Sequence, residues 1–189
     1  MIEKIKANWE NDLQIKFSDQ FWGEALEAVN SSSSCARLSL IQFKVLHRTH
    51  YSRAKLAKIY PDTVEDKCNR CSLSPCDLAH MFWLCPKLVG FWEGFFKTIS
   101  EIFQIQISPS PHIAIFGRPE NIDTMNKIQL NITAFTSLIA RRRILLQWRS
   151  SLPPSFKSWI GDVMSFLKLE KVKFSLRRSS DRFYSCWNP

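Results

Sequence analysis

The local fold is decided by two short stretches of sequence, CNRC at positions 68–71 and LAHMFWLC at positions 78–85. Two cysteines stand two residues apart, a histidine follows after eight residues, and another cysteine follows after four more. Tetrahedral zinc takes four thiolate or imidazole ligands, and a C-x2-C turn presents two thiolates to one ion. The pattern C-x2-C-x8-H-x4-C therefore predicts a zinc-knuckle-like site that uses Cys68, Cys71, His80 and Cys85.

Cys76 leaves the fourth ligand open. It lies five residues after Cys71 and could replace His80 in a shell of cysteines alone, or it could be a buried free thiol. We favour His80, because Ser74-Pro75 has the pattern of an N-cap and a first helical residue. A helix that begins there would carry His80 on its metal-facing side. The remaining alternative is a group of reduced, buried cysteines without a metal.

The rest of the chain has the apolar periodicity of a mainly α-helical protein. Apolar residues recur at three-to-four spacing after Ser18, over 38–50, over 88–103, from about 123 to 149 and from about 155 to 178. A shorter helix is predicted from near Ser52 to just before Pro61. Between 105 and 121, prolines and a Gly-Arg-Pro turn predict an extended connector, with one short strand at 113–116.

These patterns divide the chain of 189 residues into four segments. We expect an N-terminal helical segment at 1–66, the zinc-binding motif with its apolar helix at 67–104, a connector at 105–122 and a basic helical segment at 123–189. Only five glycines occur, which argues against glycine-rich phosphate loops and Rossmann turns.

Positive charge is concentrated in two parts of the sequence. Lys and Arg number 26 against 17 acids, a net charge of +9, and the segment 141–189 alone holds eleven bases and three acids. No acid occurs between Glu27 and Asp62. Localised charge of this kind favours a polyanion such as nucleic acid, with a merely solubilising surface as the alternative. The candidate nucleic-acid contacts are Arg37, Lys44, Arg48, Arg53, Lys55, Arg141, Arg142, Arg143, Arg149, Arg177 and Arg178.

No group of residues has the pattern of an active site. The sequence has no Asp-Asp pair, no Y-x-D-D and no zinc-deaminase signature, and four protein ligands leave a zinc ion without an open position. His47 and His50 have no cysteine or acid close in sequence, so we interpret them as a surface pair. We therefore expect no enzymatic activity.

The zinc motif resembles a segment of known retroelement proteins. The strings at 68–71 and 78–86, together with Phe91-Trp92, are similar to the zinc-binding segment downstream of the reverse transcriptase in LINE-type (non-LTR) retrotransposon polyproteins. This resemblance implies the same four zinc ligands and gives Trp92 the role of a packing tryptophan. Less specific similarity to the C-terminal tail of these polyproteins continues at 139–142, 146–149, 153–154, Trp159 and 183–187.

The resemblance implies a function and partners. The chain would correspond to the non-catalytic accessory region of such a polyprotein, present as a fragment, with element RNA or target-site DNA as ligand and a reverse transcriptase body as a possible protein partner. The alternative is a structural or protein-interaction zinc scaffold without direct nucleic-acid contact, with Trp148, Trp159 and Trp187 as interface anchors. Arginines on one open face would favour nucleic-acid binding, whereas arginines paired with acids such as Asp162 would favour the scaffold.

The first residues alternate charged and apolar side chains, without the apolar run of a secretory signal or a membrane span. We expect a location in the nucleus or cytoplasm, as a ribonucleoprotein, and neither secretion nor a membrane partner.

Overall fold

The computed structural model describes residues 2–187, so Met1, Asn188 and Pro189, at the ends of the first and last predicted segments, lie outside it. Within this range the chain forms helices and no β-strand, which confirms the mainly α fold class. The elements in chain order are α1 (Ile2–Leu13), α2 (Asp19–Ser31), α3 (Ala36–Leu46), α4 (Arg53–Ile59), the π-helix η1 (His80–Leu84), the 3-10 helix η2 (Pro86–Leu88), α5 (Val89–Phe103), the π-helix η3 (His112–Phe116), the 3-10 helix η4 (Ile122–Thr124), α6 (Lys127–Leu146), α7 (Phe156–Leu176) and α8 (Ser180–Trp187).

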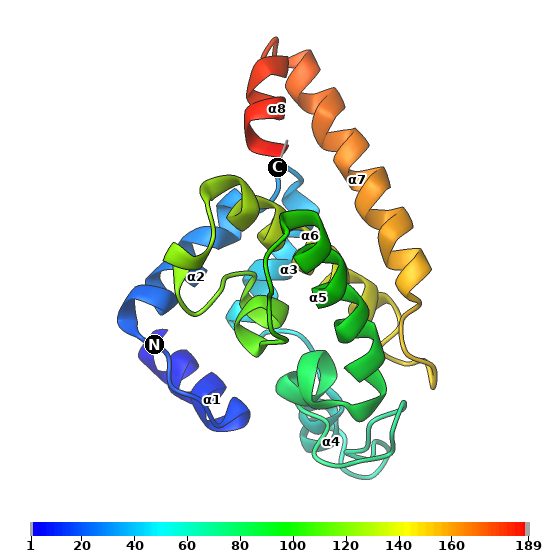
Figure 1. The fold of residues 1–189 in the computed structure, drawn as a ribbon. Helices are drawn as coiled ribbons and strands as arrows, with labels where there is room; N and C mark the ends of the chain where they lie inside the picture. Colours follow the sequence, from blue (N-terminus) through cyan, green and yellow to red (C-terminus); the bar gives the residue numbers. More distant parts are fainter. Residues whose placement is uncertain (1, 188–189) are drawn as a thin grey trace.

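Helix α6 is the centre of the arrangement. Every residue from Ile132 to Arg141 is buried, because α3, α7, α8 and η3 all pack against this helix. A helix enclosed on all sides needs apolar or small residues around its whole circumference rather than on one stripe. In Figure 1, α7 runs along one side of the molecule, and α8 lies at the opposite end from α4 and the loop that follows it.

Side-chain caps begin several of the predicted helices. Ser18 accepts a hydrogen bond from the backbone N–H of Phe21, and Ser52 accepts one from that of Lys55. Asn126 and Gln129 form a reciprocal capping box at the start of α6. These caps satisfy N–H groups that have no partner inside the helix, and the helices predicted after Ser18 and near Ser52 begin there, whereas the helix predicted from about 123 begins at Lys127.

Three long-range polar contacts join distant parts of the chain around one hydrophobic core, which draws side chains from all four predicted segments. The Trp9 indole N–H donates to the Leu46 carbonyl over 3.0 Å, and the Trp159 indole donates to the Thr136 carbonyl over 3.1 Å. Glu170 of α7 is buried and accepts hydrogen bonds from the Ser33 hydroxyl and the Ser34 N–H. The serine-rich break between α2 and α3 is thereby held against α7.

Two local predictions are wrong. The strand expected at 113–116 is the π-helix η3, which begins after Pro111 and ends at Gly117, a residue with a φ of 74°. All five of its residues are buried, so their apolar character reflects complete enclosure rather than the two faces of a strand. No helix begins at Ser74-Pro75. The last predicted helix, from about 155 to 178, is confirmed as α7, and α8 follows it as an additional helix that the sequence analysis did not predict.

Candidate metal centre and basic surfaces

Two local structures bring the predicted ligands together. Cys68 and Cys71 lie on a tight turn, closed by hydrogen bonds from the Ser72 N–H to the Cys68 carbonyl and from the Cys68 N–H to the Leu73 carbonyl. His80 begins η1, and Cys85 directly follows its end. The Cys85 N–H donates to the His80 carbonyl, a bond across five residues that defines a π-turn.

This π-turn explains why the spacing H-x4-C works. In an α-helix, which turns by about 100° per residue, residues five apart point about 140° from each other. The wider π-turn reduces that angle, so the side chains of His80 and Cys85 can point to the same site. Asp77 caps the turn, because its Oδ1 accepts the backbone N–H of His80 over 2.7 Å. The cap thus lies three residues after the Ser74 position that the sequence favoured.

The four predicted ligands form one compact cluster. The Sγ atoms of Cys68, Cys71 and Cys85 and the imidazole of His80 all lie within 4.8 Å of one another. The Cys68 and Cys85 sulfurs are 3.9 Å apart, and the Cys71 sulfur is 3.2 Å from His80 Nε2. Two thiolates bound tetrahedrally to one zinc ion at about 2.3 Å would be about 3.8 Å apart. The cluster therefore has the donor set and the dimensions of a site that could hold a metal ion.

The electrostatics of the cluster come from burial and from nearby N–H groups. Burial raises the pKa of the Cys85 thiol to about 12. Burial also acts on Cys68, but hydrogen bonds from the backbone N–H groups of Cys71 and Arg70 outweigh it and lower the pKa of that thiol. Burial lowers the pKa of His80, which favours the neutral imidazole that a metal needs.

Arg70 is a buried charged residue of the cysteine turn that the sequence analysis did not select. It lies between the first two cysteines, is 7% exposed, and donates from Nη2 to the Met81 carbonyl over 3.2 Å. A divalent ion with three thiolates and a neutral imidazole would carry a net charge of −1, which a buried guanidinium nearby would partly compensate. A buried base inside a C-x2-C turn is the signal that could have identified it.

Cys76 lies outside the four-ligand cluster. Burial and the neighbouring Cys68 raise the pKa of its thiol to about 12. Its backbone connects the cluster to the rest of the molecule: the carbonyl accepts the Ala54 N–H of α4, and its N–H donates to Asp66 Oδ1. Trp92 has the packing position that the resemblance implied, since it is 2% exposed and its indole donates to the Phe82 carbonyl over 2.8 Å.

The first group of predicted nucleic-acid contacts is open to solvent. Arg37, Lys44 and Lys55 are exposed, and in the described part of the chain none of them forms an ion pair. Arg53 is half-buried. Arg48 differs, because it forms an ion pair with Asp12 and lies 4.4 Å from the centre of the Trp9 ring.

The second group of predicted nucleic-acid contacts, on α6, forms hydrogen bonds and ion pairs within the molecule. Arg141 is completely buried and donates to the carbonyls of Ala114 and Ile113, so its prediction as a nucleic-acid contact is corrected. Burial lowers its pKa to about 9, which still leaves it protonated at pH 7. Arg142 and Arg143 both pair with Asp162 of α7, over 3.1 and 2.6 Å.

The remaining predicted contacts lie farther along the chain. Arg149 is exposed, with its guanidinium 5.1 Å from the Trp148 ring centre. Arg177 and Arg178 are exposed at the end of α7.

A scan against known protein families finds none that matches this chain. Within the described residues, no helix combines the length and the apolar character that crossing a membrane requires.

Proposed function

We propose that this chain is a zinc-stabilised, non-catalytic helical module that binds nucleic acid. The metal would be Zn²⁺, because three thiolates and one imidazole in a compact cluster form the donor set that structural zinc prefers over hard cations. Four protein ligands fill a tetrahedral shell, so the metal would fix the fold rather than activate water. The resemblance to the region downstream of a LINE-type reverse transcriptase is part of the same proposal.

One observation carries the nucleic-acid part of the proposal. The acid-free segment between Glu27 and Asp62 exposes Arg37, Lys44, Lys55 and Lys58, none of which has a carboxylate partner among the described residues. Unpaired surface bases leave a positive field that attracts phosphate groups and releases their counterions on contact. The segment also lies beside the proposed zinc site, through the hydrogen bond from Ala54 to Cys76.

A salt titration tests this proposal. We expect the purified protein to bind a fluorescein-labelled single-stranded RNA, with log affinity falling linearly with log salt at about −0.7 per phosphate contact. Three to five contacts would give a slope of about −2 to −4 by this rule. Binding that does not weaken between low and physiological salt would contradict the proposal. Metal analysis gives the second readout, and we expect one equivalent of zinc.

A second candidate function is the scaffold without nucleic-acid contact. The observation in its favour is the use of Arg141, Arg142 and Arg143 inside the molecule, on carbonyls and on Asp162. Full zinc occupancy together with a flat salt response would support this candidate over the first.

A further inference from the structure

A cleft of about 340 Å³ lies between α1, the α3–α4 connection and the start of the metal-binding segment. Its walls carry His47, Arg48, His50, Lys55 and Lys58. The volume corresponds to on the order of ten water molecules, enough for a partly hydrated phosphate group. Several basic side chains therefore line one concave site.

The charges around the cleft are unbalanced. Among the described residues, Asp77 supplies the one carboxylate that lines the cleft. Lys55 and Lys58 are exposed one helical turn apart on α4, and no ion pair to either is found among the described side chains. Two lysines on one wall of a water-filled cleft give a positive potential that a neighbouring phosphate would neutralise.

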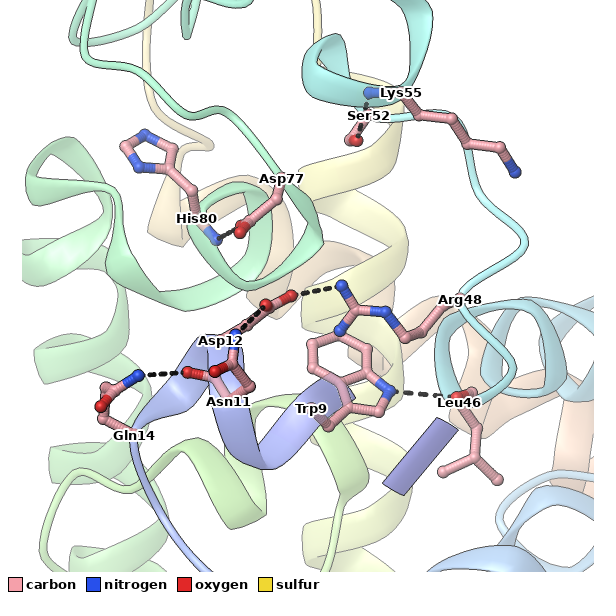
Figure 2. A network of polar contacts seen from close by, with 10 residues as sticks. All are labelled: Trp9, Asn11, Asp12, Gln14, Leu46, Arg48, Ser52, Lys55, Asp77 and His80. Carbon is pink, nitrogen blue, oxygen red and sulfur yellow. Dashed lines mark hydrogen bonds and ion pairs between the residues drawn. The ribbon is translucent and has the colours of Figure 1, made fainter. Parts of the chain in front are cut away.

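Arg48 lines the cleft and is held in place by contacts inside the protein. Asp12 and the Trp9 ring hold its guanidinium, and Figure 2 shows this arrangement between Trp9 and the Asp77–His80 segment. Its Nη1 nitrogen is buried and has no hydrogen-bond partner. Arg48 therefore forms part of the cleft wall, while Lys55 and Lys58 are the bases open to a ligand.

Tyr51 lies at the edge of this site. It is 57% exposed, and the Lys55 ammonium lies 5.1 Å from its ring centre. Exposed aromatic rings next to phosphate-binding bases are typical of proteins that stack single-stranded bases.

We propose that this cleft binds a phosphodiester of a single-stranded nucleic acid, with Lys55 and Lys58 as its contacts and Tyr51 as a stacking surface for the adjoining base. The proposal rests on the proposed function and locates its site on α4 rather than on the basic C-terminal segment. The cleft would then be ordered by the metal site, because Ala54 of α4 is bonded to Cys76.

The test uses the full chain, a labelled 20-nucleotide oligo-U RNA and two double variants of equal charge. Lys55→Ala with Lys58→Ala changes the cleft, whereas Lys157→Ala with Lys168→Ala removes two exposed lysines from α7. We expect the cleft variant to lose about tenfold or more in affinity and to reduce the salt slope by about 1.4, two contacts at 0.7 each. The α7 variant should stay within about threefold of the parent. Lys55→Arg with Lys58→Arg should restore most of the affinity.

Each outcome separates the cleft from the general function. If the α7 variant loses as much affinity as the cleft variant, the cleft is not the site, although nucleic-acid binding stands. If the parent shows no salt-dependent binding, the proposed function fails, and the cleft proposal fails with it. Competition by inorganic phosphate distinguishes the sources of the phosphate: we expect millimolar phosphate to displace little RNA, and full displacement would indicate a site for free phosphate instead.

Discussion

The bases of α3 and α4 and the arginines of α6 occupy opposite environments. Lys44 and Lys55 point to solvent without carboxylate partners among the described residues, whereas Arg141 is fully enclosed and Arg142 and Arg143 share Asp162. The α6 arginines lie on a helix that is packed on all sides, so their charges are used to join α6 to η3 and α7. The α3 and α4 bases lie on shorter helices, of which α4 is at one end of the molecule and α3 near its middle (Figure 1), and the side chains of Lys44 and Lys55 are exposed.

The difference shows that charge density along the chain is a poor guide to a binding surface. A run of three arginines carries more charge per residue than any part of α3 or α4. Burying an arginine nevertheless costs free energy unless its N–H groups form hydrogen bonds. A run of arginines on a packed helix therefore forms contacts inside the protein. The sparser bases remain available for binding.

Removal of the metal should have the largest effect, and it should affect the two regions differently. In Cys85→Ser we expect less than half an equivalent of zinc and loss of amide protection over 53–85, while α6 stays protected. Structural zinc contributes roughly 10 kcal/mol of binding free energy in isolated fingers, and α4 depends on this segment through Ala54 and Cys76. Metal analysis and hydrogen exchange measure both results.

Cys76→Ser is the matched control, because Cys76 is buried beside the cluster but lies outside it. It should retain zinc. Retention of zinc by His80→Ala together with its loss from Cys76→Ser would transfer the fourth ligand position to Cys76.

Truncation of Arg141 should have the next largest effect, on stability alone. Arg141→Ala leaves a cavity and deprives the Ala114 carbonyl of its donor, so we expect a loss of about 3 kcal/mol in the free energy of unfolding. Arg141→Met should recover part of it by filling the space. RNA affinity of both variants, measured where they are folded, should equal that of the parent. A stable Arg141→Ala with weakened RNA binding would reverse the comparison of the two regions.

Neutralising Asp162 should produce a smaller loss. Asp162→Asn removes the shared partner of Arg142 and Arg143, whose side chains are 28% and 19% exposed. We expect the free energy of unfolding, measured in urea, to fall by about 1–2 kcal/mol. Glu101→Gln is the control, since the Lys97–Glu101 pair is exposed and should contribute less than about 0.5 kcal/mol. Equal effects of the two substitutions would mean that the ion pairs of Arg142 and Arg143 stabilise the fold no more than an exposed ion pair does.

Substitution of His112 should have the smallest effect, on the pH dependence of stability. It is packed edge-on against Phe17 and Phe21, and burial lowers its pKa from 6.5. The His112 imidazole is therefore protonated more readily in the unfolded chain than in the folded protein. The contribution of the neutral imidazole to stability is present above about pH 6.5 and is lost as the pH falls. Unfolding at pH 7.5 and 5.5 should show His112→Phe to be less acid-sensitive than the parent, by at most about 1.4 kcal/mol per pH unit. An identical pH dependence of the two proteins would contradict this.

Much of the metal centre was determined by the sequence itself. The ligand set follows from spacing because each pair of ligands is close along the chain and is brought together by local hydrogen bonds, at the 68–73 turn and the 80–85 turn. The same locality explains the helix starts at Ser18, Ser52 and Asn126, where a side chain caps N–H groups two or three residues away.

Only the tertiary structure decided which charges are available and which apolar residues form a strand or a helix. The position of Arg141 depends on η3, which lies some 27 residues earlier in the chain, and that of Arg142 depends on Asp162, 20 residues later. Likewise η3 packs against α3 and α6, so all five of its residues are buried and its apolar sequence does not distinguish a strand from a helix. Burial is the property of an assembled surface, so a base in the sequence becomes a core residue or a ligand contact only when distant helices have packed around it or left it open.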